Sequence, residues 1–197
     1  GLTTSYKISK SLSTDRSYGC SYLAVNNDTG AKEEVFIKTP RIAAGVPFGE
    51  VEKILSDIFI SFVAEYQNRK KIDDINKGAE VAAGILGFGF YVVEDSSKEL
   101  VVPFLVQKYI DCPSIESFFS SYPDQQEPKY VDDRGIFNGI SEPDEWFRFA
   151  HDITDIVRRV HNRNIIHGEI VPKNILISRD NNVIRPILVD FGKSYQL

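Results

Sequence analysis

The chain has 197 residues, of which 42% are hydrophobic and 26% are charged, a composition typical of a folded globular protein. Its formal net charge of -5 argues against binding to nucleic acid or to an acidic membrane surface, and no apolar run is long enough to cross a bilayer. Cys20 and Cys112 are far apart and form no CxxC pair. This pattern argues against a disulfide framework or a zinc site and favours a reduced, cytoplasmic setting.

The first 108 residues predict an antiparallel sheet with one long helix. Alternating apolar residues and turn signals predict five strands, two of them within residues 4–25 and the others at 34–38, 88–93 and 100–108. Between the third and fourth strands, apolar residues recur at helical spacing over residues 51–77. They are Val51, Ile54, Leu55, Ile58, Phe62, Tyr66 and Ile72. The expected fold class is α+β.

The remaining residues predict a second, mostly helical part. Ser114 is a typical N-cap for a short helix. Residues 122–143 are rich in Pro, Asp, Gly and Gln and predict a long loop that could contact a partner. A helix with acidic residues in its first turn is predicted from Pro143 to Val160.

Residues 165–174 read Ile-Ile-His-Gly-Glu-Ile-Val-Pro-Lys-Asn and lie between a predicted helix and a predicted strand. The sequence Asp190-Phe191-Gly192 follows a second strand. This order and spacing resemble the catalytic loop and the metal-binding motif of the protein kinase superfamily, in particular the Ser/Thr protein kinase domain.

The resemblance follows the order of kinase motifs along the chain and implies a two-lobed fold. Residues 1–108 would form the N-terminal lobe, and residues 109–197 would form the hinge and the first part of the large lobe. The chain reaches Leu197 soon after the Asp-Phe-Gly motif. We therefore expect a C-terminal continuation or a dimer mate to complete the large lobe, because its apolar surface would otherwise be uncovered.

The resemblance assigns the nucleotide phosphates to a lysine and its acidic partner. Lys38 ends the third predicted strand and would bind the α- and β-phosphates of ATP, with Glu65 of the long helix holding its ammonium group. Glu50, Glu52 and Asp57 are the rival partners for Lys38. Glu65 is favoured because it lies in the middle of the helix, beside the apolar face.

The turn at residues 13–19 stands where a kinase has its glycine-rich phosphate flap. Gly19 matches the last glycine of that G-x-G-x-x-G pattern, whereas Thr14 and Arg16 stand in the places of the other two. Glycines let backbone N–H groups approach phosphates closely, so their loss should stiffen or displace the flap. An ordinary hairpin turn is the alternative interpretation of this segment.

Residues 104–110 resemble the kinase hinge. By this resemblance, Gln107 guards the adenine pocket, and the main chain of Lys108, Tyr109 and Ile110 hydrogen-bonds the adenine. Main-chain groups suit this task because they read the edge of an aromatic ring without requiring particular side chains.

The resemblance also assigns the metal. Asn174 and Asp190 would hold Mg²⁺ through side-chain oxygens, the ligand type that this ion prefers. His167 would be a packed and hydrogen-bonded residue of the loop and not a catalytic base.

Glu169 stands where kinases have their catalytic aspartate and is one methylene longer. A misplacement of about 1 Å can cost roughly 10²-fold in a reaction that depends on positioning. Val171 stands where Ser/Thr kinases have a loop lysine. Lys173 could supply the missing positive charge, because offsets of two and four residues share a face in an extended backbone.

Three functions are compatible with these residues. The first is an ATP- and Mg²⁺-binding kinase-like domain with weakened phosphoryl transfer to Ser or Thr hydroxyls of a protein substrate. The second is a pseudokinase, a nucleotide-regulated or scaffolding module that binds a regulatory protein. The third is a small-molecule kinase on the same fold, since loops of the His-Gly-acid type also occur in relatives that phosphorylate aminoglycosides and sugars.

Overall fold

The structure, a computed structural model, divides the chain into two compact units. Unit 1 comprises Gly1–Lys70 and Gly84–Tyr109, and unit 2 comprises Lys71–Ala83 and Ile110–Leu197. The residues that the structure describes are 5–13, 19–28, 33–42, 46–73, 81–95, 98–120, 143–180 and 183–197. Thr14 and Arg16 of the predicted flap lie outside these residues, as does the predicted loop up to residue 142.

Unit 1 is built on a five-stranded sheet in the order β1-β2-β3-β5-β4, and every neighbouring pair is antiparallel. The strands are β1 (Tyr6–Ser13), β2 (Gly19–Asn26), β3 (Glu34–Pro40), β4 (Ile85–Asp95) and β5 (Lys98–Lys108). The predicted five-stranded antiparallel sheet is confirmed. Strands β4 and β5 are longer than predicted, because their pairing continues to Asp95 and Lys98.

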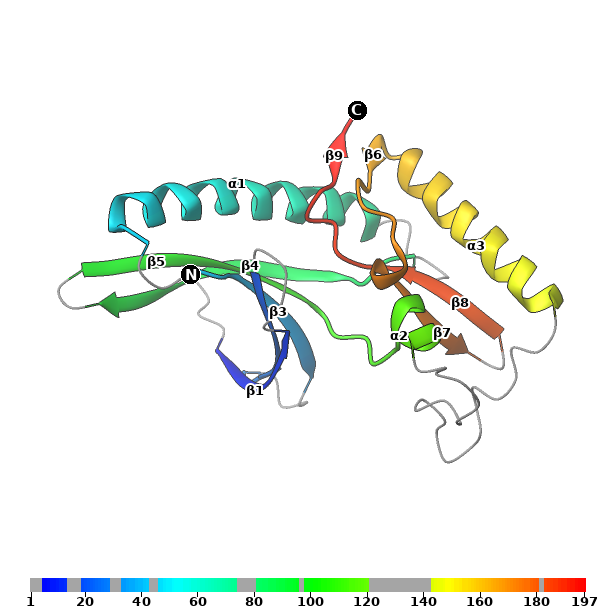
Figure 1. Cartoon of the computed structure of the whole chain (residues 1–197), viewed down its shortest axis with the longest axis horizontal. Helices are drawn as coiled ribbons and strands as arrows, with labels where there is room; N and C mark the ends of the chain where they lie inside the picture. The colour runs from blue at the N-terminus through cyan, green and yellow to red at the C-terminus, as the bar shows by residue number, and fades with distance from the viewer. Residues whose placement is uncertain are drawn as a thin grey trace. The chain divides into compact units, whose positions relative to one another are not determined.

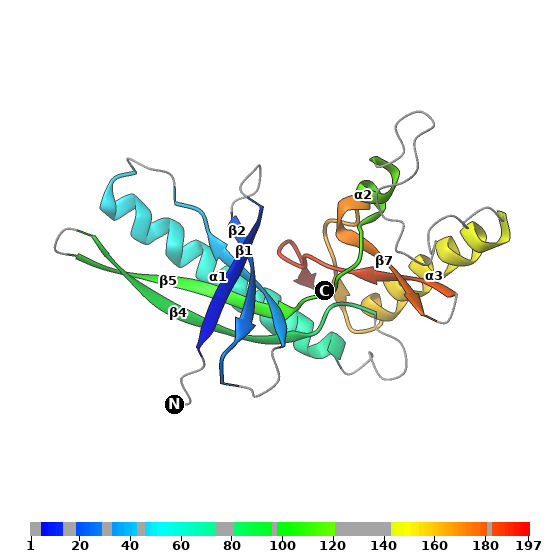
Figure 2. The ribbon, with the colours of Figure 1, turned by 90° about the horizontal axis from the view of Figure 1, so that it is seen from below.

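One long helix, α1 (Phe48–Asp73), runs along β4 and β5 (Figures 1 and 2). Val51 and Leu55 of α1 pack against Val102 of β5. Further along the helix, Phe62 packs with Ile85 and Leu105. The apolar residues that recur at helical spacing therefore lie on the face of α1 that packs against the sheet. The predicted long helix and the α+β class are confirmed.

Unit 2 contains helices and short strands. The helices are α2 (Ile115–Ser120), α3 (Pro143–His161) and the 3₁₀ helix η1 (Pro172–Asn174). The strands are β6 (Ile165–Ile166), β7 (Ile175–Asp180), β8 (Val183–Leu188) and β9 (Tyr195–Gln196). Strand β7 pairs with β8 and β6 with β9, both antiparallel, so the described part of this unit is mixed and not mostly helical. The reason is that the apolar runs on both sides of residues 181–182 pair with each other as a hairpin.

The N-cap predicted for α2 is present. The backbone N–H of Ser117 donates to Ser114 Oγ at 3.1 Å, and the N–H of Phe118 donates to the Ser114 carbonyl at 2.8 Å. These bonds satisfy N–H groups of the first turn that have no partner within the helix.

The core of unit 2 explains why residues 71–83 belong to it, although the sequence placed them with the first 108 residues. Ile72, Val81 and Ala82 are fully buried among side chains of α2, α3, β7 and β8. The N–H of Leu188 donates to the Val81 carbonyl at 3.0 Å, and Ala82 forms a parallel bridge with Leu188. This short segment is therefore held by β8 and by apolar packing within unit 2.

No helix in the described part of the chain is long and apolar enough to span a membrane.

Candidate functional site

The sequence-predicted phosphate-binding lysine of unit 1 is ion-paired. Lys38 Nζ on β3 lies 3.3 Å from Glu65 Oε2 on α1, so Glu65 is the partner and not one of the rival acids. The side chain of Glu65 is only 1% exposed, whereas that of Lys38 is 23% exposed. Gln107 Nε2 on β5 donates to the other carboxylate oxygen, Oε1, at 3.1 Å. The buried carboxylate therefore has two donors, and part of the lysine side chain stays accessible to an anion.

Sheet register brings these two donors together. In the β3–β5 pair, Lys38 lies opposite Leu105, and Gln107 is two residues further along β5. Residues two apart in a strand point to the same face, and a side chain shares its face with the residue directly opposite. Lys38 and Gln107 therefore both face α1, where Glu65 lies.

Gly19 has a structural role in the sheet, and its predicted contact with a nucleotide phosphate stays a prediction. It begins β2 and lies opposite Pro40. A Cβ atom at this position would lie 2.8 Å from the carbonyl oxygen of Thr39, closer than real side chains approach a backbone atom. The close approach of β2 to β3 therefore requires glycine here.

Two main-chain groups of the predicted hinge form hydrogen bonds within the chain. The N–H of Lys108 donates to the Gly84 carbonyl at 2.8 Å, and the Ile110 carbonyl accepts from the N–H of Cys112 at 2.9 Å. These two groups are committed to the backbone and not to an adenine. Adenine recognition by Lys108, Tyr109 and Ile110 therefore stays a prediction that would depend on their other main-chain groups.

His167 joins the loop of unit 2 to the Asp190 segment. Its ring is 1% exposed and packs against Phe191, with ring centroids 4.3 Å apart. Nε2 lies 3.1 Å from the Val189 carbonyl, and Nδ1 accepts from the N–H of Glu169 at 3.3 Å. This pair of contacts assigns the proton to Nε2, because a carbonyl only accepts and a backbone N–H only donates. The packed, hydrogen-bonded state expected of His167 is present.

Gly168 lies where the loop comes close to the Asp190 segment, and it was not among the predicted site residues. Its φ is +81°, and an added Cβ would collide with the carbonyl oxygen of Lys193. Both the backbone conformation and the lack of space require glycine. A glycine between the histidine and the acid was the only signal of this contact in the sequence.

Asn174 and Asp190 lie on adjoining backbone in unit 2. The Val189 N–H donates to the Asn174 carbonyl at 3.0 Å, so the residue before Asp190 is bonded to Asn174. Asn174 is 4% exposed, and its Nδ2 donates to the Glu169 carbonyl at 3.1 Å. This bond turns the amide nitrogen toward the loop and fixes the orientation of the amide. Asp190 has φ of 58°, a left-handed conformation that is often found at functional sites in residues other than glycine.

These two residues fit Mg²⁺ by their donor chemistry. An amide oxygen and a carboxylate are hard oxygen ligands, and Mg²⁺ is usually bound through one or two such groups together with phosphate oxygens and water. Among the described residues, no three His, Cys, Asp or Glu side chains are grouped so as to hold a metal ion by themselves. Phosphate oxygens and water would therefore have to complete the coordination.

Glu169 is held by two lysines. Its Oε1 accepts from Lys193 Nζ at 2.9 Å and lies 3.8 Å from Lys173 Nζ. Lys193 directly follows Gly192 of the Asp-Phe-Gly motif and was not among the predicted site residues. Lys173 is near Glu169 as expected, but the expected reason was wrong, because Lys173 lies in η1 and not in extended backbone.

This environment lowers the pKa of Glu169. The hydrogen bond from Lys193 is the largest cause, and the charges of Lys173 and Lys193 add to it. Because the folded-state pKa is below the unfolded value, this interaction stabilises the fold above the unfolded pKa. The stabilisation is lost as the pH falls through the folded-state pKa.

We expect Lys193→Ala to raise the pKa of Glu169 toward its ordinary value of 4.5, because the shortest charged hydrogen bond is lost. Lys173→Ala should raise the pKa less, since Lys173 is further from the carboxylate. An NMR titration of glutamate carboxyl carbons measures both shifts. A Glu169 pKa at or above 4.5 in the parent chain would contradict this geometry.

We expect Gly168→Ala to lower the free energy of unfolding by at least about 1–2 kcal/mol, the cost of placing a side chain in left-handed backbone. The collision with the Lys193 carbonyl adds to this cost. Gly87→Ala is the matched control, because no atom lies within 4 Å of a Cβ at that position. Urea denaturation measures both, and equal stability of the two variants would refute the close approach.

No family model matches this chain, and no curated protein sequence matches it.

Proposed function

We propose that this chain is a protein kinase-like domain that binds ATP and Mg²⁺ and transfers phosphate weakly to Ser or Thr hydroxyls of a protein. The observation that carries the proposal is the junction in unit 2. There, the His167 contacts hold the segment with Glu169 and Asn174 against the segment with Asp190. The carboxylates of Glu169 and Asp190 and the buried amide of Asn174 are thus carried by two backbone segments that are hydrogen-bonded to each other. Phosphoryl transfer requires positioning groups that are held in this way.

Each residue has a role in the proposed reaction. Lys38, held by Glu65, binds phosphate oxygens of the nucleotide, while Asn174 and Asp190 supply oxygen ligands to the metal. Bound Mg²⁺ would neutralise the charge that develops on the phosphate oxygens. Glu169 would orient the acceptor hydroxyl and accept its proton.

Two features support weak transfer. The lysine contacts that lower the pKa of Glu169 also make its carboxylate a poorer base, and general-base catalysis weakens as the pKa of the base falls below the working pH. The flap has Thr14 and Arg16 in place of glycines, so fewer close backbone contacts to phosphates are expected.

The pseudokinase alternative is supported by the same Lys193 contact. A carboxylate that already accepts from an ammonium group at 2.9 Å must release this bond before it can accept from a substrate hydroxyl. In that case the chain would bind a nucleotide or a regulatory protein without transfer. We propose the cytoplasm as its location for either function, because neither Cys20 nor Cys112 is part of a disulfide.

We expect Mg·ATP at 100 times its Kd to stabilise the chain by about 2.7 kcal/mol, as for any ligand that binds only the folded state. Lys38→Ala and Asp190→Asn should each largely abolish the shift. Asp190→Asn keeps the size of the side chain and tolerates left-handed backbone, but it removes the charge. Differential scanning fluorimetry measures the shift, and isothermal titration calorimetry measures the affinity.

Lys10→Ala is the matched control for Lys38→Ala, because Lys10 is an exposed lysine of β1. It should leave the shift unchanged. Lys38→Ala also removes a partner of buried Glu65 and can unfold the chain, so Asp190→Asn serves as the independent test. A parent chain that is folded and shows no shift at millimolar Mg·ATP would overturn nucleotide binding and leave the scaffold function.

Substitutions of Glu169 separate the kinase from the pseudokinase. Glu169→Asp should raise phosphoryl transfer or leave it near the parent rate, because it restores the side-chain length found in kinases. Glu169→Gln should lower transfer, because an amide of the same size cannot take the proton. ATP affinity should change little in either variant. Incorporation of labelled phosphate into a generic protein substrate measures the rate, and equal background transfer in all three forms would exclude the enzyme.

A further inference from the structure

Strand β4 is one of the two edges of the unit 1 sheet, and the two edges differ in how well they are protected. Strand β1, at the other edge, carries Lys7 and Lys10 and has two register shifts in its pairing with β2. Lysines and bulges of this kind prevent pairing with another chain. The run from Ile85 to Val93 contains no charged residue and no proline, and its one register shift lies at its start, before Phe88.

Large apolar side chains are exposed along β4. Phe90 is 50% exposed and Val92 is 55% exposed, and four further residues of the run are also exposed. These four are Leu86, Phe88, Tyr91 and Val93. A long, apolar and accessible edge strand offers both hydrogen-bonding groups and apolar area to an added strand.

Proline in β5 fixes which backbone groups of β4 point to the free edge. Phe90 lies opposite Pro103, which has no N–H to donate. This pair is therefore of the non-hydrogen-bonded kind, and the N–H and C=O of Phe90 point away from β5. By alternation, those of Phe88 and Val92 also point to the free edge.

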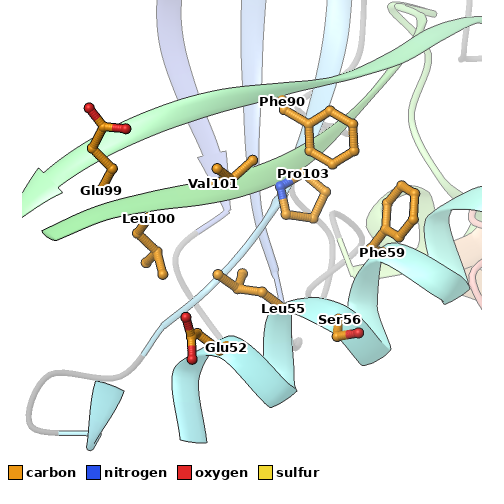
Figure 3. A pocket seen from close by; sticks show the side chains of 9 residues that line it. All are labelled: Glu52, Leu55, Ser56, Phe59, Phe90, Glu99, Leu100, Val101 and Pro103. Atoms are coloured by element: carbon orange, nitrogen blue, oxygen red, sulfur yellow. The ribbon is translucent and has the colours of Figure 1, made fainter. Parts of the chain in front are cut away.

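The face of β4 that lies toward α1 carries an aromatic cluster. The ring centroid of Phe59 on α1 lies 5.3 Å from that of Phe90 and 6.3 Å from that of Phe88. Phe59 and Phe90 also border a hollow of about 260 Å³ between α1 and the β4–β5 hairpin, which Val101 and Pro103 of β5 help to line (Figure 3). The cluster holds the middle of β4 against α1 and so keeps the free edge in strand form.

We infer that the free edge of β4 is a self-association surface, on which β4 of a second copy of this chain pairs antiparallel about Phe90. In this register Phe90 pairs with Phe90 of the second copy as a hydrogen-bonded pair. Phe88 pairs with Val92 of the second copy, and Val92 with Phe88. These are aromatic and aromatic–β-branched pairs, the kinds that stabilise neighbouring strands.

The strand suits a copy of itself for three reasons. The groups that point to the free edge fall on the residues that a two-fold axis at Phe90 brings together. The residues that pair with each other in this register, from Gly87 to Val93, include no charge to be buried or repelled. Gly87 has open space where a Cβ would be, and Val93 of the second copy would lie opposite it. The two sheets would join into one whose remaining edges are the β1 strands, which are protected.

Sedimentation velocity of the full chain over a range of concentrations tests the association. We expect a reversible dimer, and Val92→Lys should raise its Kd at least about tenfold, because a lysine on an edge strand opposes strand addition. Val101→Lys is the matched control. Val101 is the cross-strand partner of Val92, is 52% exposed and lies on β5, so the dimer should persist. Circular dichroism melting shows that both variants are folded.

The register is tested by disulfide trapping with Cys20 and Cys112 replaced by serine. The Cα atoms of a hydrogen-bonded antiparallel pair are about 5.5 Å apart, a separation that a disulfide can span. Phe90→Cys should therefore form a covalent dimer on mild oxidation, whereas Val101→Cys should not. A chain that stays monomeric at a protein concentration about 100 times above a micromolar Kd would overturn the inference. So would a dimer that Val92→Lys does not weaken, or equal trapping at positions 90 and 101.

Discussion

The buried carboxylate of Glu65 is the constraint on which the arrangement of unit 1 depends. Burying a carboxylate that is only 1% exposed is costly unless charged or polar donors surround it. Lys38 and Gln107 supply those donors from two neighbouring strands. Their contacts therefore hold α1 against β3 and β5 at this point. Because Lys38 stays partly exposed, the same contacts hold an ammonium group in place for an anion.

In unit 2, the polar site residues are held in place mainly by contacts with the backbone. His167 bridges its loop to Val189 with one ring nitrogen and accepts from Glu169 with the other, while Gly168 lets the Lys193 carbonyl come close. Histidine suits this position because one ring can donate and accept at the same time. The positions of Glu169, Asn174 and Asp190 all follow from this junction. The polar groups proposed to act are thus held by residues that would not themselves touch a substrate.

The sequence predicted those features that follow from local periodicity. Alternation predicted the strands of unit 1, and helical spacing predicted α1. The kinase resemblance implied an acidic partner for Lys38 on that helix, and the position of Glu65 beside the apolar face selected it among the rival acids. Contacts set by tertiary approach were not predictable in this way. The bridge between Ala82 and Leu188, which assigns residues 71–83 to unit 2, joins segments far apart in the chain. Lys193 reaches Glu169 only because Gly168 allows the two backbones to touch, and neither residue reveals this alone.

The lysine contacts have two opposing effects on the Glu169 carboxylate. Lysine contacts keep its carboxylate ionised and in one place, which favours a group that must be ready to accept a proton. The same contacts stabilise the charged form and so reduce the tendency to accept that proton. The extra methylene of glutamate carries the carboxylate further from its backbone than aspartate would, toward a lysine on the adjoining segment. An aspartate at residue 169 would hold its carboxylate closer to the loop backbone and would therefore contact Lys193 less well. Side-chain length at this position therefore sets how strongly the carboxylate is held, and so the balance between a positioned group and a basic one.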